Sequence, residues 1–211
     1  MIRRRRSTDL STGRLEAFTD GVFAIAATLL VLDLTDHSLG EVSTDAQLWA
    51  ALAGMWELFL NFGLSFLLLC LLWRVHVQQF EHIKRVDTPM IWLNNLRLLF
   101  IALVPFATAV TTEHSHFLAG RLAMPVAFLL AILTSWAQWQ WAVAHAEIIL
   151  PEMDRADAVA YGHGSSGALI IAIAVVALSP WLGSWAFLLF ALDGVLTRAL
   201  RGATPAGRAE A

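Results

Sequence analysis

The chain has 211 residues, of which 58% are hydrophobic and 15% charged, and its mean hydropathy is +0.64. Soluble domains are closer to about 45–50% apolar and about 25% charged, so this composition excludes a disordered chain and disfavours an ordinary soluble globule. The net charge of −3 gives no electrostatic basis for nucleic-acid binding, and the single cysteine, Cys70, excludes an internal disulfide framework.

Apolar runs predict an all-α membrane protein, because a helix needs about 20 mostly apolar residues to cross a bilayer. We expect a basic N-terminal segment over residues 1–16, a six-helix membrane domain over 17–201 and a disordered tail over 202–211. The last two apolar runs are short and meet at a Pro- and Gly-containing turn, so one broken or re-entrant segment is the alternative. The six predicted transmembrane helices are Phe18–Thr35, Leu48–Trp73, Met90–Thr111, Leu122–Leu150, Gly167–Leu182 and Trp185–Leu200.

The positions of lysine and arginine predict the orientation, since these residues collect on the cytoplasmic side of a membrane. With six crossings, all 14 lysine and arginine residues except Arg97 and Arg121 fall on one side of the membrane. The opposite side carries acidic residues, among them Asp36, Glu41 and Asp45 in one loop. We therefore expect a multi-pass protein of the cell membrane with both termini in the cytoplasm.

The first apolar run is unusual because hydroxyl and charged side chains interrupt it. An ionisable residue at membrane depth is costly, so Asp20 is expected either to be functional or paired or to cap the helix start. Asp20 points about 100° away from a stripe roughly 80° wide that follows the same helix. The stripe contains Gly21, Ile25, Thr28, Leu32 and Thr35.

The segment from Arg14 to Leu34 resembles the first-helix signature of the endosomal and lysosomal potassium channels, transmembrane protein 175, and of their bacterial relatives. The signature reads Arg-x-x-x-Phe-Ser/Thr-Asp-Gly-Val-Phe-Ala-Ile-Ala-x-Thr-Leu-Leu-Val-Leu, and the chain matches it almost without gaps. Thr19 stands where the family usually has serine, and it keeps the hydroxyl. A looser likeness continues through Ser65, Phe66, Trp73, His76, Phe80, Trp92, Leu93, Asn94, Pro105, Phe106 and Thr108.

The resemblance implies a six-helix subunit that forms a homotetramer in the lipid bilayer, with the first helix of each subunit lining a central pore. It implies a potassium-selective leak-type channel in which K⁺ is the permeant ion and no cofactor is needed. Ile25 matches the family's apolar constriction, and Thr28 matches a selectivity residue that contacts K⁺ transiently. Leu32 lies on the same stripe and is expected to form a second apolar ring.

A polar network is expected near the cytoplasmic end of the first helix. The resemblance and the predicted membrane depth place Trp73, His76 and Asn94, from the next two helices, at the level of the signature's polar residues. His76 among them would make such a network sensitive to pH. The expected members are Arg14, Thr19, Asp20, Trp73, His76 and Asn94.

Other function classes find less support in the sequence. The chain has no Thr-Val-Gly-Tyr-Gly filter, and its single tyrosine, Tyr161, is expected in a flexible polar loop. No catalytic triad, Walker motif or paired carboxylates stand out, so an enzyme is not expected. A proton-conducting channel or a proton-coupled secondary transporter is the alternative to a potassium channel.

Overall fold

The computed structural model describes residues 12–192 as helices joined by short loops, which confirms the all-α class. Five of these helices are long and apolar enough to cross a membrane. The fifth of these candidate spans joins the last α-helix to a 3₁₀ helix. The elements are α1 (Thr12–Asp36), α2 (Asp45–Gly54), α3 (Trp56–Phe80), α4 (Thr88–Glu113), α5 (Leu118–Ala144), α6 (Arg155–Leu182) and the 3₁₀ helix η1 (Gly183–Leu192).

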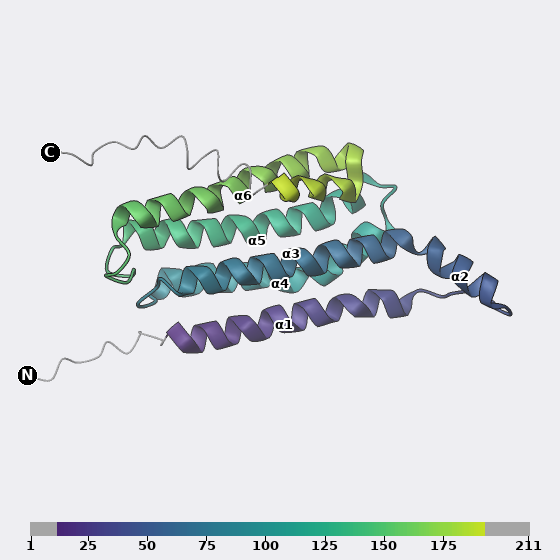
Figure 1. Ribbon diagram of the computed structural model, residues 1–211, viewed down its shortest axis with the longest axis horizontal. Coiled ribbons are helices and arrows are strands. Elements are labelled where there is room, and N and C mark those ends of the chain that lie inside the picture. The colour runs from purple at the N-terminus through teal and green to yellow at the C-terminus, as the bar shows by residue number, and fades with distance from the viewer. Residues whose placement is uncertain (1–11, 193–211) are drawn as a thin grey trace, which may run out of the picture.

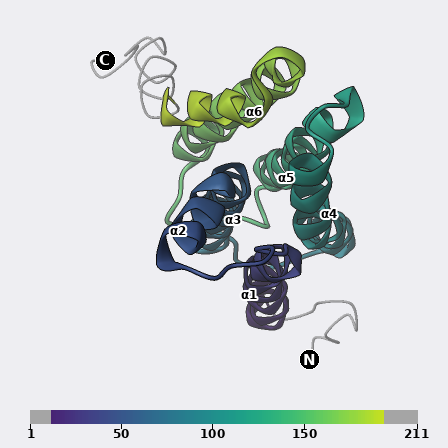
Figure 2. The ribbon, with the colours of Figure 1, turned by 90° about the vertical axis from the view of Figure 1, so that its right-hand side faces the viewer.

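The long helices run side by side along the longest axis of the molecule (Figure 1). Helix α1 packs against both α3 and α4, α4 packs against α5, and α5 packs against α6. Seen end-on, α1 lies at one edge of the bundle and α6 at the opposite edge (Figure 2). One flank of α1 is therefore left without a neighbour inside the described part of the chain.

Two apolar clusters hold the bundle together. The larger joins α1, α3, α4, α5, α6 and η1 and includes Phe23, Leu30 and Phe128, which are at most 4% exposed. The smaller surrounds Trp139 and Met90, close to the loops that join α3 to α4 and α5 to α6. Burying an apolar side chain of this size contributes about 1.5–3 kcal/mol.

The helix expected at Leu48–Trp73 is two helices. Helix α2 ends at Gly54, a poor helix former, and the chain turns at Met55, whose N–H bonds back to the carbonyl of Leu52. None of the residues of α2 is buried. Helix α3 continues beyond the predicted end to Phe80, because Gln79 and Phe80 are buried rather than solvated.

The loop between the fourth and fifth predicted helices is shorter than expected. Helix α5 ends at Ala144 instead of Leu150, and α6 begins at Arg155, where the side chain of Asp154 caps it. Tyr161 lies inside α6 and not in a flexible loop. Gly162 lets α6 approach the ring of Trp139 closely, since a Cβ at that position would be 3.3 Å from the indole.

The expected sixth helix, Trp185–Leu200, is described only as far as Leu192, and there it is the 3₁₀ helix η1. Gly183 makes the turn into it with a φ of +55°, a conformation that favours glycine. Helix η1 then folds back against α6 (Figure 1). The expected tail over 202–211 and most of the basic segment over 1–16 lie outside the described residues.

Lysine and arginine residues gather at one end of the bundle. The start of α1, the α3–α4 loop and the α5–α6 loop share this end (Figure 1). We call it the basic end for its Lys84, Arg85 and Arg155, although acidic residues such as Asp87 and Glu147 lie there too. Arg121 lies at the other end, where it donates hydrogen bonds to the carbonyls of Pro180 and His116.

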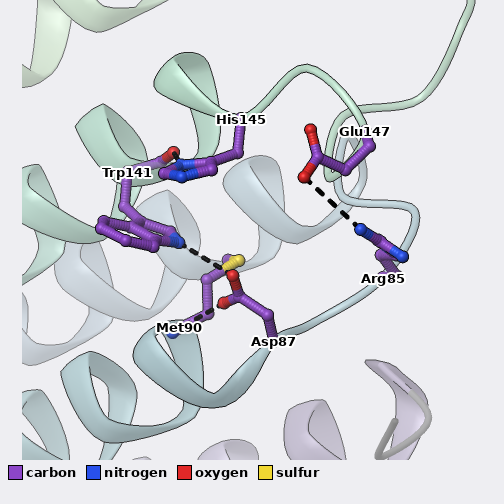
Figure 3. A network of polar contacts seen from close by, with 6 residues as sticks. All are labelled: Arg85, Asp87, Met90, Trp141, His145 and Glu147. Carbon is purple, nitrogen blue, oxygen red and sulfur yellow. Dashed lines mark hydrogen bonds and ion pairs between the residues drawn. The ribbon is translucent and has the colours of Figure 1, made fainter. Parts of the chain in front are cut away.

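The two loops of the basic end are joined to each other. The Lys84 N–H donates to the carbonyl of Ile148 at 2.8 Å. Figure 3 shows Asp87, which caps α4 through the N–H of Met90 and also accepts a 3.1 Å hydrogen bond from the Trp141 indole. These contacts fix α4 relative to α5 at the level where α1 begins.

Candidate ion-conducting site

Helix α1 has two faces with opposite surroundings. Thr19, Phe23, Ala26 and Leu30 are buried against α3 and α4. The opposite face is the exposed stripe, which we define as Gly21, Ile25, Thr28, Leu32 and Thr35. The residues Ile25 and Leu32 are 60% and 52% exposed, so this apolar face has no cover within the described chain.

The hydroxyl groups of the exposed stripe are bonded to their own helix. The Thr28 hydroxyl donates towards the carbonyls of Ala24 and Ile25, at 3.0 and 2.9 Å. The Thr35 hydroxyl donates to the carbonyl of Leu32 at 2.8 Å. Such bonds are ordinary for threonine in helices, but they leave the oxygen lone pairs directed away from the backbone.

The buried face of α1 is tied to α4 through a pair of fully buried polar side chains. The amide nitrogen of Asn94 donates a 2.9 Å hydrogen bond to the Thr19 hydroxyl, and neither residue has exposed surface. A buried polar group without a partner costs about 1–3 kcal/mol, so this pair favours one register between the two helices.

The neighbouring residue ties α1 to α3. The Trp73 indole N–H donates a 2.8 Å hydrogen bond to the Asp20 carboxylate. Both side chains are exposed in the single chain, and they line one end of a groove between α1 and α3 of about 360 Å³. Asp20 is thus paired rather than free, as one of the two expectations for it required.

The structure places the other expected network residues differently. His76 is 1% exposed and bonds to Arg97 of α4 instead of to a polar residue of α1. Arg14 is exposed and forms no hydrogen bond or ion pair with the described residues. Four of the six side chains therefore form two separate pairs, Thr19 with Asn94 and Asp20 with Trp73, and the six do not form one continuous network.

Arg97 is the residue that the sequence reasoning missed. Its side chain has no exposed surface, and its guanidinium donates to the carbonyl of Leu72 at 3.2 Å and contacts Nδ1 of His76 at 3.5 Å. Its charge also lies 5.5 Å from the ring centre of Phe23 on α1. The sequence does indicate Arg97, because it is an arginine inside an apolar run and a charge at membrane depth usually has a functional or paired role.

No group of three or more His, Cys, Asp or Glu side chains able to hold a metal ion occurs among residues 12–192. The features that could act on an ion are therefore the exposed stripe and the polar pairs behind it. An apolar stripe with a hydroxyl one turn away suits a passing cation better than it suits a bound cofactor.

Comparison with known proteins identifies the family of this arrangement. Residues 14–105, which contain most of α1, all of α2 and α3 and most of α4, match the family described as endosomal/lysosomal potassium channel TMEM175. A protein of Chamaesiphon minutus named as a potassium channel is 33% identical over 180 residues, which cover 81% of this chain and 87% of that protein. The chain belongs to the TMEM175 family. This family consists of ion channels and not of enzymes.

Further TMEM175 relatives extend the comparison. A potassium channel of Streptomyces collinus is 38% identical over 132 residues, which cover 59% of this chain and 63% of the relative. A bovine relative named endosomal/lysosomal proton channel TMEM175 is 36% identical over 144 residues, and the chain covers only 30% of its length. The two comparisons thus include relatives named for different ions.

Solved structures agree with the fold. The crystal structure of a lysosomal potassium-selective channel TMEM175 homologue from Chamaesiphon minutus has a TM-score of 0.69 and 28% identity, covering 90% of this chain and 97% of that one. A second TMEM175 structure, a potassium-channel variant in complex with a nanobody fusion, has a TM-score of 0.60 at 15% identity and supports the fold alone.

Proposed function

We propose that the chain is one subunit of a homotetrameric, potassium-selective leak-type channel, and that α1 lines its pore. The observation that carries the proposal is the exposed stripe on α1, with Ile25, Thr28 and Leu32 turned away from the subunit's own core. Bacterial relatives named as potassium channels support the same conclusion.

The stripe requires several copies of the chain. One subunit presents a single copy of α1, and one helix cannot surround a pore. Head-to-tail contacts that close into a ring give a cyclic assembly, in which four copies of α1 would face a common axis. Such a ring would place the apolar part of the stripe away from lipid and around the ion path.

Ile25 and Leu32 supply the constrictions in this proposal. Four isoleucine side chains around one axis form a narrow apolar ring, and such a ring controls conduction by excluding water. Leu32 lies two turns further along the same face and forms a second ring. An ion at either ring keeps part of its hydration shell, because the ring has no polar atom to replace it.

Thr28 supplies the ion selectivity. Its hydroxyl proton is engaged by the carbonyls of Ala24 and Ile25, so the oxygen meets an ion as an acceptor. Four such oxygens would offset part of the dehydration of a cation, and potassium is easier to dehydrate than sodium. The chain has no Thr-Val-Gly-Tyr-Gly filter sequence, and its single tyrosine, Tyr161, lies within α6. No carbonyl filter therefore takes part in this proposal.

The polar pairs behind the stripe hold the pore wall. Thr19 with Asn94, and Asp20 with Trp73, attach the first turns of α1 to α4 and α3. Arg14 is exposed near the same end of α1, where a neighbouring subunit can reach it. The basic end of the bundle faces the cytoplasm in this proposal, with both chain termini, and the membrane is the cell membrane.

Proton conduction is the second candidate, because the bovine and human relatives are named proton channels. Ion flux through the purified protein in liposomes distinguishes potassium conduction from proton conduction. With potassium, sodium or proton gradients imposed in turn, we expect current or dye response to follow the potassium gradient. A response to the proton gradient alone would favour the second candidate, and saturating, coupled flux would favour a transporter.

A further inference from the structure

Arg97 lies where a charge is costly. It sits in the middle of α4, in a helix long and apolar enough to cross the membrane, and it has no exposed surface. No carboxylate pairs with it among residues 12–192. Its partners are instead a backbone carbonyl, an imidazole nitrogen and an aromatic ring, provided by two other helices.

These three contacts join α4 to α3 and to α1, the proposed pore wall. On α3, the guanidinium donates to the Leu72 carbonyl and contacts His76. On α1, its charge lies 5.5 Å from the centre of the Phe23 ring, within the range of a cation–π contact. We propose that Arg97 is a positioning residue that fixes the rotation of α1 through Phe23, an inference that rests on the proposed pore-lining role of α1.

Helix geometry explains how this contact would act on the ion path. Phe23 and Ile25 are two residues apart, which places them about 200° apart around α1. Any rotation that moves the Phe23 ring off the guanidinium therefore turns Ile25 and Thr28 away from a central axis. A planar guanidinium over a ring is directional, whereas purely apolar packing would tolerate small rotations.

A second contact, one turn away, makes the positioning specific. Asn94 and Arg97 are three residues apart on α4 and share a face, and their partners Thr19 and Phe23 are four residues apart on α1. Two consecutive turns of α1 are thus held by two polar residues that lie one turn apart on α4. Together they fix both the rotation of α1 and its position along its own axis.

An electrostatic role would behave differently. If the Arg97 charge acted directly on a passing cation, its removal would raise cation conductance whether or not the Phe23 ring was present. If Arg97 acts by positioning α1, removing the guanidinium and removing the ring disturb the same contact. Their effects on ion selectivity would then overlap instead of adding.

The test uses the purified full-length channel, with the potassium-over-sodium permeability ratio taken from reversal potentials under bi-ionic gradients. The variants are Arg97→Met, Phe23→Leu and the two combined. Arg97→Met keeps the side-chain volume, because replacing a buried charge by an apolar group often preserves folding. The controls are Leu98→Met, a buried neighbour on α4, and Phe128→Leu, a buried ring on α5 that packs against Phe187.

We expect each single variant to lower the permeability ratio roughly threefold or more, the scale of losing one cation–π contact, and the double variant to go no lower. Both controls should keep the wild-type ratio. If Arg97→Met does not assemble, Phe23→Leu against Phe23→Tyr decides, and only Phe23→Tyr should retain the ratio.

Wild-type ratios in the assembled single variants, or fully additive losses in the double variant, would overturn the inference and leave the channel proposal standing. A wild-type protein without preference for potassium would overturn the proposed function first, and the positioning role with it.

Discussion

The indole N–H of Trp73 donates a 2.8 Å hydrogen bond to the carboxylate of Asp20, and this bond attaches α1, the proposed pore-lining helix, to α3. The bond involves a charged acceptor, and hydrogen bonds of that kind contribute about 1.5–3 kcal/mol when shielded from water. In the single chain both residues are exposed, so the full effect requires that the proposed assembly bury them.

We therefore expect Asp20→Ala and Trp73→Phe to lower the yield of tetramer in mild detergent. Glu16→Ala, one turn earlier on the same helix, is the matched control and should assemble as the wild type does. Cross-linking or size measurement of each variant checks this. Equal yields for Asp20→Ala and Glu16→Ala would show that the bond does not contribute to assembly. Arg14→Ala belongs to the same series, and we expect it too to lower yield or activity more than Glu16→Ala.

The pair formed by Thr19 and Asn94 makes a sharper prediction, because both side chains are fully buried. Thr19→Val preserves shape but leaves the Asn94 amide without its partner, which costs about 1–3 kcal/mol. Thr19→Ser keeps the oxygen and should cost less than about 1 kcal/mol. Thermal stability of the purified protein distinguishes the two, and a Thr19→Ser variant as unstable as Thr19→Val would contradict the role of the hydroxyl.

The polar contacts of the loops at the basic end should contribute unequally to the stability of the fold. Asp87 both caps α4 and accepts from Trp141, so Asp87→Ala removes two hydrogen bonds and should cost about 1–2 kcal/mol. The Arg85–Glu147 ion pair spans 3.5 Å between two side chains that are about half exposed, and Glu147→Gln should cost at most about 1 kcal/mol. Melting temperatures under identical detergent conditions check this. A Glu147→Gln variant that is less stable than Asp87→Ala would contradict the prediction.

Much of α1 could be predicted from sequence because helical periodicity acts within one segment. The stripe containing Ile25 and Thr28 follows from residue spacing alone, and the structure places it on the exposed face. Partners between helices depend on their relative register, which spacing within one helix does not contain. Thus the sequence leaves Asp20 either functional or paired or capping the helix start, and its bond to Trp73 and the bond of His76 to Arg97 are visible only in three dimensions.

The misplaced helix ends have local causes that hydropathy does not capture. Tyr161 and Gly162 belong to a polar stretch, yet the stretch is helical, and Gly162 packs directly against Trp139. Gly54 interrupts an apolar run that is long enough to form one helix. Hydropathy averaged over a segment contains neither the close packing at Gly162 nor the low helix propensity of Gly54.

Assembly can be tested without any mutation. If α1 lines a shared pore, the protein in mild detergent should have the mass of four chains plus bound detergent and lipid. Mass photometry or chemical cross-linking measures this directly. A population that consists only of monomers, at concentrations where flux is observed, would contradict a pore formed by four copies of α1.

Selectivity variants of the exposed stripe separate its apolar and hydroxyl parts. Ile25→Ala or Ile25→Asn should raise conductance and relax the preference for potassium, because the constriction becomes wider or polar. Thr28→Ser should largely preserve selectivity, since it keeps the oxygen. Leu30 lies on the opposite, buried face at 1% exposure, so the control there is Leu30→Met, which avoids the cavity that alanine would leave.

The most direct test of the central claim is the reversal potential of Thr28→Ala under bi-ionic potassium and sodium gradients, in the same lipid as the wild type. The account predicts a shift towards the value for equal permeability, because four hydroxyl oxygens no longer offset the dehydration of potassium, while Leu30→Met keeps the wild-type potential. A Thr28→Ala channel that reverses at the wild-type potential, or a Leu30→Met channel that shifts as far, would contradict the claim that α1 forms the selective pore wall.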